Sequence, residues 1–407
     1  MSDVRSPLGA SGWLHPDDCR LEDFIALVEQ QTSLADYPFA SEVVQNSLVY
    51  DGDRLRAAAA DPTTRRAVQA ELARALLHGP GVVAFRGAFA DTAPVDAVSD
   101  AFFAMVAEQH ALGINAGDHY AKPGANDRVW NTIEKLARRD PEAFVAYYAN
   151  EAIALVAEAW LGPSYTVTSQ VNVVNPGGEA QSPHRDYHLG FLSNEAAMAY
   201  PTHVHQLSPV LTLQGAVAHC DMPVESGPTL YLPYSQQYLP GYLAWRLEPF
   251  RQYFEDHHVQ PPLAKGDAVF FNPALFHAAG HNRSTDIHRI ANLLQVNSAF
   301  GRVMEAIDKP AMIDAIYPAL TRLAAGGDRS AVHNVITAAA DGYPFPTNLD
   351  RDRPLGRLTP LSSAELVDEA LRQGWPHDRL CDELAAYARR RETGVGPGGT
   401  LVPMDGV

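Results

Sequence analysis

The sequence predicts a mainly β core with helical additions at both ends. Between residues 165 and 296, short runs rich in Val, Thr, Tyr and Phe alternate with Gly and Pro, which is typical of short strands joined by turns. The segments before and after this region are rich in Ala, Leu and Arg and carry helix start signals. Several short strands separated by turns favour a sandwich or a barrel.

The first 165 residues are expected to be mostly helical. Asp61-Pro62 combines an N-capping residue with proline at the first helical position, and the helix should end before Gly79-Pro80-Gly81. The apolar run Val82–Phe85 then predicts a short buried strand. Further helices are expected at Pro94–Ala111 and Pro141–Trp160.

The core is expected to contain seven strands, each bounded by turn residues. These are Tyr165–Val174, Ser182–His188, Val210–Ala218, Thr229–Leu232, Ala268–Asn272, Leu275–Ala279 and Ile290–Val296. A helical insertion is expected at Gln236–His258, and the tail predicts helices at Ser362–Gln373 and His377–Arg391. The first of these tail helices opens with a capping box, Ser362 to Glu365. The Gly- and Pro-rich end, Gly394–Val407, is expected to fray.

Charge and cysteine content exclude some classes of function. The 407 residues contain 31 Lys and Arg against 48 Asp and Glu, a formal net charge of −17. Such a charge repels nucleic acid and anionic membranes, although one local cation can still bind a small anion. The three cysteines form no CxxC pair, the first residues show no signal peptide, and no apolar run is long enough to span a bilayer. A soluble cytoplasmic protein without nucleic-acid or membrane partners is therefore expected.

The most informative segment is Ser182-Pro-His-Arg-Asp-Tyr-His188. On a strand, His184, Asp186 and His188 would point the same way, because side chains alternate between the two faces. Ionisable groups are costly to bury without a partner, and two imidazoles with one carboxylate form the usual ligand set of non-heme Fe(II). His277, which follows the apolar stretch from residue 267, is the obvious third ligand. On spacing alone, a structural His184–Asp186 pair with a core His277 is the slightly favoured interpretation.

Three ordered blocks of sequence resemble the phytanoyl-CoA dioxygenase (PhyH-like) family of Fe(II)/2-oxoglutarate oxygenases. The blocks are Ser182–Phe191, residues 220–235 with Glu225-Ser-Gly-Pro-Thr229, and residues 266–289 from Gly266-Asp267 through His277 to Arg289. Gly81–Phe89 is similar to the N-terminal strand of the family. The resemblance runs from about residue 81 to residue 296, and ordered blocks are far more specific than one short motif.

The resemblance implies iron ligands at His184, Asp186 and His277, with 2-oxoglutarate and O2 as cosubstrates. It also implies that Arg289 binds the distal carboxylate of 2-oxoglutarate, which a guanidinium matches bidentately. Arg283 is a rival for that role, although it lies in a turn where an arginine is usually solvated. Gln214 falls on a strand position that often contacts the cosubstrate in the family.

The sequence departs from the family in two places. Residues 232–236, Leu-Pro-Tyr-Ser-Gln, lack the common Gly and His of the family pattern, and Ala279 stands where a cosubstrate-binding Ser is often found. Asp186 is present, whereas related halogenases carry a small residue there, so halogenation is disfavoured. Substrate-pocket residues are expected among Tyr187, His188, Phe191 and Tyr231. For His188, a further ligand, a proton donor or a plain hydrogen-bonding role all stay open.

Together these observations predict a double-stranded β-helix (jelly roll, cupin-like) flanked by helices. The expected parts are a helical extension at residues 1–80, a catalytic domain at residues 81–300 with its insertion at residues 236–258, and a helical extension at residues 301–407. The expected activity is hydroxylation, or another oxidation, of an unactivated C–H bond in a small molecule, with release of succinate and CO2. The alternative is a non-catalytic cupin-like protein that binds a metal or ligand. The oligomeric state is left open by the sequence, and a homodimer through the C-terminal helices is one arrangement compatible with it.

Overall fold

The computed structural model describes residues 12–114, 124–395 and 399–400. Its main sheet has eight strands in the order β1-β2-β3-β8-β6-β10-β5-β4, and β7 pairs with β9 in a second, two-stranded sheet. All neighbours are antiparallel except β2 and β3. The strands are β1 (Glu42–Val44), β2 (Ser47–Asp51), β3 (Val82–Arg86), β4 (Asn126–Val129), β5 (Thr166–Val174), β6 (Thr212–Ala218), β7 (Leu230–Leu232), β8 (Ala268–Phe271), β9 (Phe276–Ala278) and β10 (Arg289–Asn297). This is the predicted jelly-roll-like core.

Side chains alternate along the strands, so the two faces of the main sheet lie in different apolar clusters. Residues such as Val171, Leu213 and Phe270 point to one face of the sheet and join a large apolar cluster with the helices. Residues of opposite parity, such as Ala216 and Phe271, form a smaller cluster with Tyr231 of the second sheet. Because a strand turns successive side chains to opposite faces, the interior between the two sheets receives only every second residue. The site described below opens into that interior.

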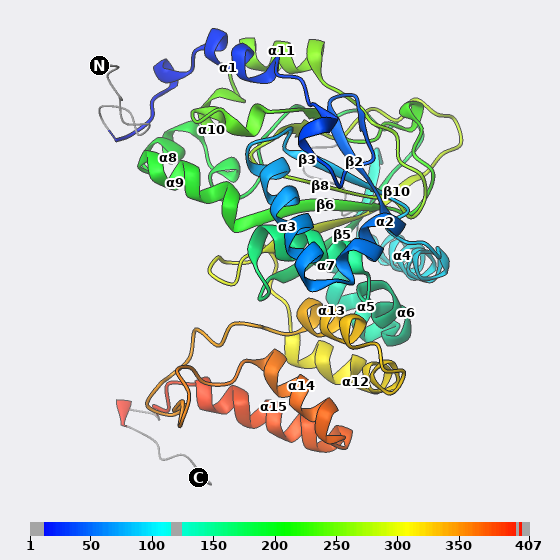
Figure 1. Cartoon of the computed structure of the whole chain (residues 1–407), viewed down its shortest axis with the longest axis vertical. Helices are drawn as coiled ribbons and strands as arrows, with labels where there is room; N and C mark the ends of the chain where they lie inside the picture. Colours follow the sequence, from blue (N-terminus) through cyan, green and yellow to red (C-terminus); the bar gives the residue numbers. More distant parts are fainter. Residues whose placement is uncertain (1–11, 115–123, 396–398, 401–407) are drawn as a thin grey trace.

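Helices cover the outer face of the main sheet (Figure 1). They are α2 (Gly52–Ala59), α3 (Pro62–Leu77), α4 (Ala93–Ala111), α5 (Thr132–Arg139), α6 (Pro141–Tyr148), α7 (Glu151–Leu161), α12 (Lys309–Ala325) and α13 (Arg329–Ala339). The helices α14 (Ser363–Gln373) and α15 (His377–Arg391) lie beyond α12 and α13 in the same view. None of the helices in the described residues is long and apolar enough to cross a membrane.

Smaller elements close the other end of the core. The 236–258 insertion contains α10 (Gly241–Ala244) and α11 (Glu248–His257), and α11 packs against α1 (Leu21–Val28) through Phe24 and Phe250, whose rings are 5.1 Å apart. The helices α8 (Asn194–Met198) and α9 (Thr202–Leu207) follow the segment with the HxD motif. Short 3-10 turns connect these pieces, at Pro16–Asp18, Leu34–Asp36, His188–Phe191, Ser208–Leu211, Val224–Ser226 and Ser235–Gln237.

Most expected elements are confirmed, and two expectations are wrong. The Pro141–Trp160 helix is two helices, because the Asn150 side chain accepts a hydrogen bond from Ile153 N and so caps a new helix that begins at Glu151. Residues 182–188 form no strand, as described below. The N-terminal region also supplies β1 and β2 to the sheet. The helices α5, α12 and α13 lie in regions that were expected to be helical, although their bounds were not predicted. The capping box at Ser362 is present. Much of Gly394–Val407, and the first eleven residues used for the signal-peptide prediction, lie outside the described residues.

His219 ties two outer helices to the sheet and makes stability dependent on pH. Its Nδ1 lies 2.8 Å from Ser99 Oγ of α4, and its Nε2 lies 2.9 Å from Tyr147 Oη of α6. Burial lowers the pKa of His219 to about 3, so the folded protein keeps the ring neutral while the unfolded chain takes up a proton below about pH 6.5. The unfolded state therefore binds more protons between about pH 6.5 and pH 3, and stability falls as the pH drops through this window.

We expect the His219 contribution to the free energy of unfolding to be about 2 kcal/mol smaller at pH 5 than at pH 7, at about 1.4 kcal/mol per pH unit below about 6.5. Urea unfolding at the two pH values should show a flatter pH dependence for His219→Gln than for the unchanged protein. The matched control is His257→Gln on the exposed side of α11, which should leave the dependence unchanged. Parallel curves for His219→Gln and the unchanged protein would contradict the prediction.

Candidate metal centre

The HxD segment lies along β9 as a loop instead of a strand. A single bridge pairs His184 with His277, through backbone hydrogen bonds of 3.0 and 3.2 Å, and the Asp186 amide donates to Pro273 O at 3.1 Å. Positive φ angles follow at once, +64° at Tyr187 and +41° at His188. Because these two residues leave the extended conformation, the chain turns away before a ladder can form.

Alternation is nevertheless kept over the three central residues. Arg185 points away from His184 and Asp186, into a buried site where its Nη2 donates to Ser235 O and Tyr238 O at 2.5 and 2.9 Å. Its guanidinium lies over the Tyr242 ring, and a Cβ atom at position 241 would collide with it, which accounts for Gly241. Arg185 thus anchors the loop from behind while its two neighbours face the interior.

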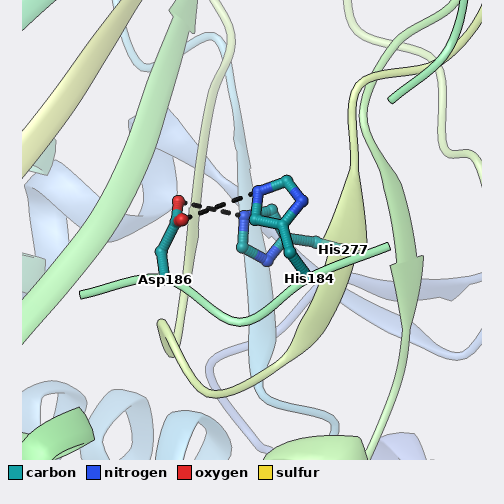
Figure 2. A group of neighbouring side chains, drawn as sticks. All are labelled: His184, Asp186 and His277. Atoms are coloured by element: carbon teal, nitrogen blue, oxygen red, sulfur yellow. Dashed lines mark ion pairs between the residues drawn. The ribbon is translucent and has the colours of Figure 1, made fainter. Parts of the chain in front are cut away.

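His184, Asp186 and His277 converge on one point (Figure 2). Asp186 Oδ1 lies 3.6 Å from His184 Nε2, and Asp186 Oδ2 lies 3.5 Å from His277 Nε2. Each histidine Nδ1 lies 2.9 Å from a backbone carbonyl, Ser182 O and Leu275 O respectively. Since a carbonyl oxygen only accepts, each Nδ1 carries the proton and each Nε2 presents a lone pair.

This arrangement has the donor set of a metal site. Two imidazole lone pairs and a carboxylate face one another at distances longer than normal hydrogen bonds, and a cation is the partner that satisfies all three. Burial raises the pKa of the Asp186 carboxyl, but His184, His277 and Gln214 outweigh it and hold the pKa well below its usual range. The carboxylate is therefore ionised at neutral pH. The residues present fit a divalent ion with a 2-His-1-carboxylate set.

Gln214, on β6, supports this carboxylate. Its Nε2 donates to Asp186 Oδ2 at 2.5 Å, while its own Oε1 is buried without a hydrogen-bond partner among the described residues. A hydrogen bond from a neighbouring residue fixes the orientation of a metal ligand. Gln214 thus contacts the expected metal ligand itself, and its free Oε1 faces the cavity that it lines.

The three converging residues and Gln214 line a cavity of about 140 Å³ between the two sheets. Its other lining residues include Arg289, Phe271, Ala279, Leu293, Arg128, Trp130, Gln170, Asn172, Phe191, Gln295 and Met304. The cavity therefore combines apolar side chains with polar side chains from β5, β6 and β10.

Arg289 is a buried cation at the first residue of β10. Only 6% of its surface is exposed, it makes no ion pair with a carboxylate of the described residues, and its Nη1 has no hydrogen-bond partner there. Burial lowers its pKa to about 10, with Cys220 and Tyr231 nearby, so it stays charged at neutral pH. A buried and uncompensated guanidinium is costly, and an anion bound in the cavity would satisfy it. Its rival Arg283 is exposed on the outside.

The four residues expected in the substrate pocket have different locations in the structure. Phe191 lines the cavity. Tyr231 lies beneath it, with its ring 5.1 Å from Phe271. Tyr187 is buried beside His188 and Phe191. His188 lies outside the group that could hold a metal, because its Nδ1 is turned toward Ser208 Oγ at 3.1 Å. For His188, the structure therefore favours the hydrogen-bonding interpretation.

Sequence reasoning missed the polar residues of β5 and β10. Gln170, Asn172 and Gln295 line the cavity although they lie in strands that are otherwise rich in Val and Leu. The signal was available in Thr168-Ser-Gln-Val-Asn172, where a polar side chain at every second position marks the face turned toward the site.

A second group of potential ligands lies on the C-terminal helices. Asp314 of α12 accepts from His377 Nε2 at 2.8 Å and from Cys381 Sγ at 3.0 Å, both on α15. Here one carboxylate oxygen already serves as acceptor for both partners, and the side chains of Asp314 and His377 are exposed. The lone pairs of this group are satisfied internally, in contrast to those around Asp186.

Comparison with known proteins matches residues 54–291 to the model of the family "Phytanoyl-CoA dioxygenase (PhyH)". No curated protein matches. Among solved structures, the chain is similar to the non-heme alpha-ketoglutarate-dependent epimerase SnoN from nogalamycin biosynthesis (20% identity, 59% of this chain and 82% of that one, TM-score 0.42). It is also similar to the carbocyclase SnoK from the same biosynthesis (22%, 56% and 83%, 0.39) and to EvdMO1 (16%, 57% and 50%, 0.40). At these scores the structures carry no argument about function, whereas the family match covers more than half of the chain.

Proposed function

The chain belongs to the phytanoyl-CoA dioxygenase family, and from this premise we propose that it oxidises an unactivated C–H bond of a small molecule, by hydroxylation or a related outcome. Its cofactors are Fe(II), 2-oxoglutarate and O2, as in the family, and the products from the cosubstrate are succinate and CO2. The observation that carries the proposal is the meeting, in one cavity, of a 2-His-1-carboxylate group whose Nε2 lone pairs are free with a buried arginine that has no ion-pair partner among the described residues.

In this proposal His184 Nε2, Asp186 and His277 Nε2 hold the iron. Bound iron supplies the redox chemistry that couples oxidative decarboxylation of 2-oxoglutarate to oxidation of the substrate. The residues of the chain do the rest. Arg289 binds the distal carboxylate and so sets the direction of the cosubstrate. Gln214 holds the Asp186 carboxylate, and Phe271 and Leu293 contribute apolar surface to the cavity.

Arg289 is also what argues against a non-catalytic cupin-like binding protein. A protein that binds only a metal needs the three ligands, and gains nothing from a buried guanidinium without an anionic partner. An oxygenase needs both, because its cosubstrate is a dianion. Since the two groups lie in one cavity, we favour the enzyme.

The test of the proposal is anaerobic addition of Fe(II) and 2-oxoglutarate to the whole chain. We expect a weak visible metal-to-ligand charge-transfer band, and succinate release once O2 is admitted with a suitable small molecule. A protein that gives neither the band nor succinate would not be an oxygenase of this class. A metal that binds without 2-oxoglutarate binding would support the cupin-like alternative.

Removing the Gln214 amide should weaken iron binding without abolishing it. Gln214→Leu deletes the donor to Asp186 Oδ2, and loss of such a supporting hydrogen bond lowers metal affinity by about 10- to 100-fold. Anaerobic Fe(II) titration followed by the charge-transfer band measures the change. Gln252→Leu, on the exposed face of α11, is the control. Unchanged affinity in Gln214→Leu would show that the carboxylate needs no such support.

We also propose the three-part organisation predicted from the sequence, with the oxygenase domain at residues 81–300. The extensions are not separate modules in this proposal, because β1 and β2 continue the main sheet and α12 packs against α5 and α6.

A further inference from the structure

Three glutamine side chains, on the adjacent strands β5, β10 and β6, form a row along the cavity. Gln170, Gln295 and Gln214 have exposed fractions of 1%, 9% and 7%. Gln295 lies opposite Gln214 in the register of β10 and β6, and its Nε2 donates to Gln170 Oε1 at 3.1 Å. The row therefore begins beside Asp186, through Gln214, and leads away from the metal group.

The outer part of this row is too far from Arg289 to serve the cosubstrate. Arg289 and Gln295 share one face of β10 and are six residues apart, a separation of about 20 Å along a strand. A five-carbon dicarboxylate that contacts the metal ligands and Arg289 cannot also reach Gln170 and Gln295. This end of the cavity is left for the second reactant.

The polar atoms at this end have unsatisfied hydrogen-bonding capacity. Gln170 Nε2 and Gln295 Oε1 are buried, and neither makes a hydrogen bond of normal length among the described residues. Burial raises the pKa of Glu305, an effect that the Asn131 backbone N–H and the Gln170 side chain oppose, so one N–H of Gln170 is turned toward this carboxyl, which is not among the residues that line the cavity. The two glutamine amides therefore offer the cavity N–H donors and one acceptor, Gln295 Oε1, and each buried group left unpaired costs about 1 to 3 kcal/mol.

Flat apolar surfaces border these polar atoms. Trp130, Phe191 and Met304 also line the cavity, and the Arg128 guanidinium lies over the Trp130 ring at 5.0 Å. Phe191 is half-exposed, so the cavity is bordered by solvent at this residue. A ligand in the cavity therefore meets aromatic side chains as well as amide groups.

We infer, on the basis of the proposed function, that the substrate presents a polyhydroxylated ring, such as a sugar, a glycoside or a cyclitol, to Gln170 and Gln295. A hydroxyl both donates and accepts, so hydroxyl groups satisfy the amide N–H donors and the Gln295 Oε1 acceptor together. Rotating either amide only exchanges its donor and acceptor, and hydroxyls match both settings. A carboxylate accepts only and an ammonium donates only, so neither matches both kinds of group, and an acyl chain would leave the amide donors and the acceptor unpaired.

The experiment uses the anaerobic complex of the whole chain with Fe(II) and 2-oxoglutarate. Hexose methyl glycosides, aryl glycosides and inositols are added in turn, each beside its O-methylated counterpart, together with hexanoate and benzoate. The charge-transfer band reports binding near the metal. We expect some polyols to shift the band and their O-methylated counterparts to have no effect. Gln170→Met and Gln295→Met should each weaken the effective polyol by about tenfold, through loss of a buried hydrogen bond.

The controls separate this inference from the proposed function. The band itself should form in both glutamine variants, and Gln252→Met should bind the polyol like the unchanged chain. Gln295→Glu keeps the side-chain shape but removes the donor to Gln170, and should also weaken binding, which covers a folding defect in the methionine variants. The inference fails if no polyol shifts the band, if hexanoate or benzoate does so better, or if the glutamine variants bind polyols unchanged. Absence of the band in the unchanged chain would instead overturn the proposed function.

Discussion

His184→Ala and His277→Ala are each expected to abolish iron binding and succinate release. Each replacement removes one of the two proposed nitrogen ligands and leaves Asp186 buried beside a single imidazole. Loss of a direct ligand should exceed the 10- to 100-fold loss in affinity that follows removal of a supporting hydrogen bond, so we expect a decrease of more than about 100-fold. Anaerobic Fe(II) titration in the presence of 2-oxoglutarate, followed by the charge-transfer band, measures it.

His188→Asn is the matched control, because it alters the third histidine of the same short segment. The His188 ring is directed toward Ser208, and the variant should keep the band and an iron affinity within a few-fold of the unchanged chain. If His188→Asn lost iron as His184→Ala does, His188 would be a ligand and the loop would have to rearrange when metal binds. Circular dichroism of all three variants shows whether a loss comes from misfolding.

Local chemistry explains which parts of this site could be predicted from the sequence. The spacing of His184 and Asp186 placed both on one side of the chain, and this is confirmed although the chain there is not a strand. The alternation argument needs an extended backbone for only three residues, and this is what the segment provides. It failed at His188 because φ becomes positive at Tyr187, a change that no residue type in the segment signals.

Contacts between residues on different strands could not be predicted from the sequence. Gln170, Gln214 and Gln295 lie far apart in the chain, and they become neighbours only through the registers of β5, β10 and β6. A register is set by tertiary pairing of the strands, which no local pattern reports. The same limit applies to the break at Asn150, where a capping side chain overrides the helical tendency of the flanking residues.

Arg289→Leu is expected to separate cosubstrate binding from iron binding. The side chain lies in the cavity without an ion-pair partner among the described residues, so its removal should leave the three metal ligands in place. Loss of one partner of a buried charge pair costs about 3 to 5 kcal/mol, and the 2-oxoglutarate concentration for half-maximal band formation should therefore rise by more than about 100-fold. Arg289→Lys should recover only part of this, because an ammonium lacks the planar fork.

Stability distinguishes this role from a structural one. If Arg289 exists to bind an anion, the protein without 2-oxoglutarate buries an uncompensated charge, and Arg289→Leu should unfold in urea at the same or a higher concentration than the unchanged chain. A structural arginine would give the opposite result. Arg283→Leu, on the exposed turn, is the matched control and should keep the normal 2-oxoglutarate requirement. If Arg283→Leu shifted the requirement and Arg289→Leu did not, the anion would bind at the surface turn, and the buried arginine would need another explanation.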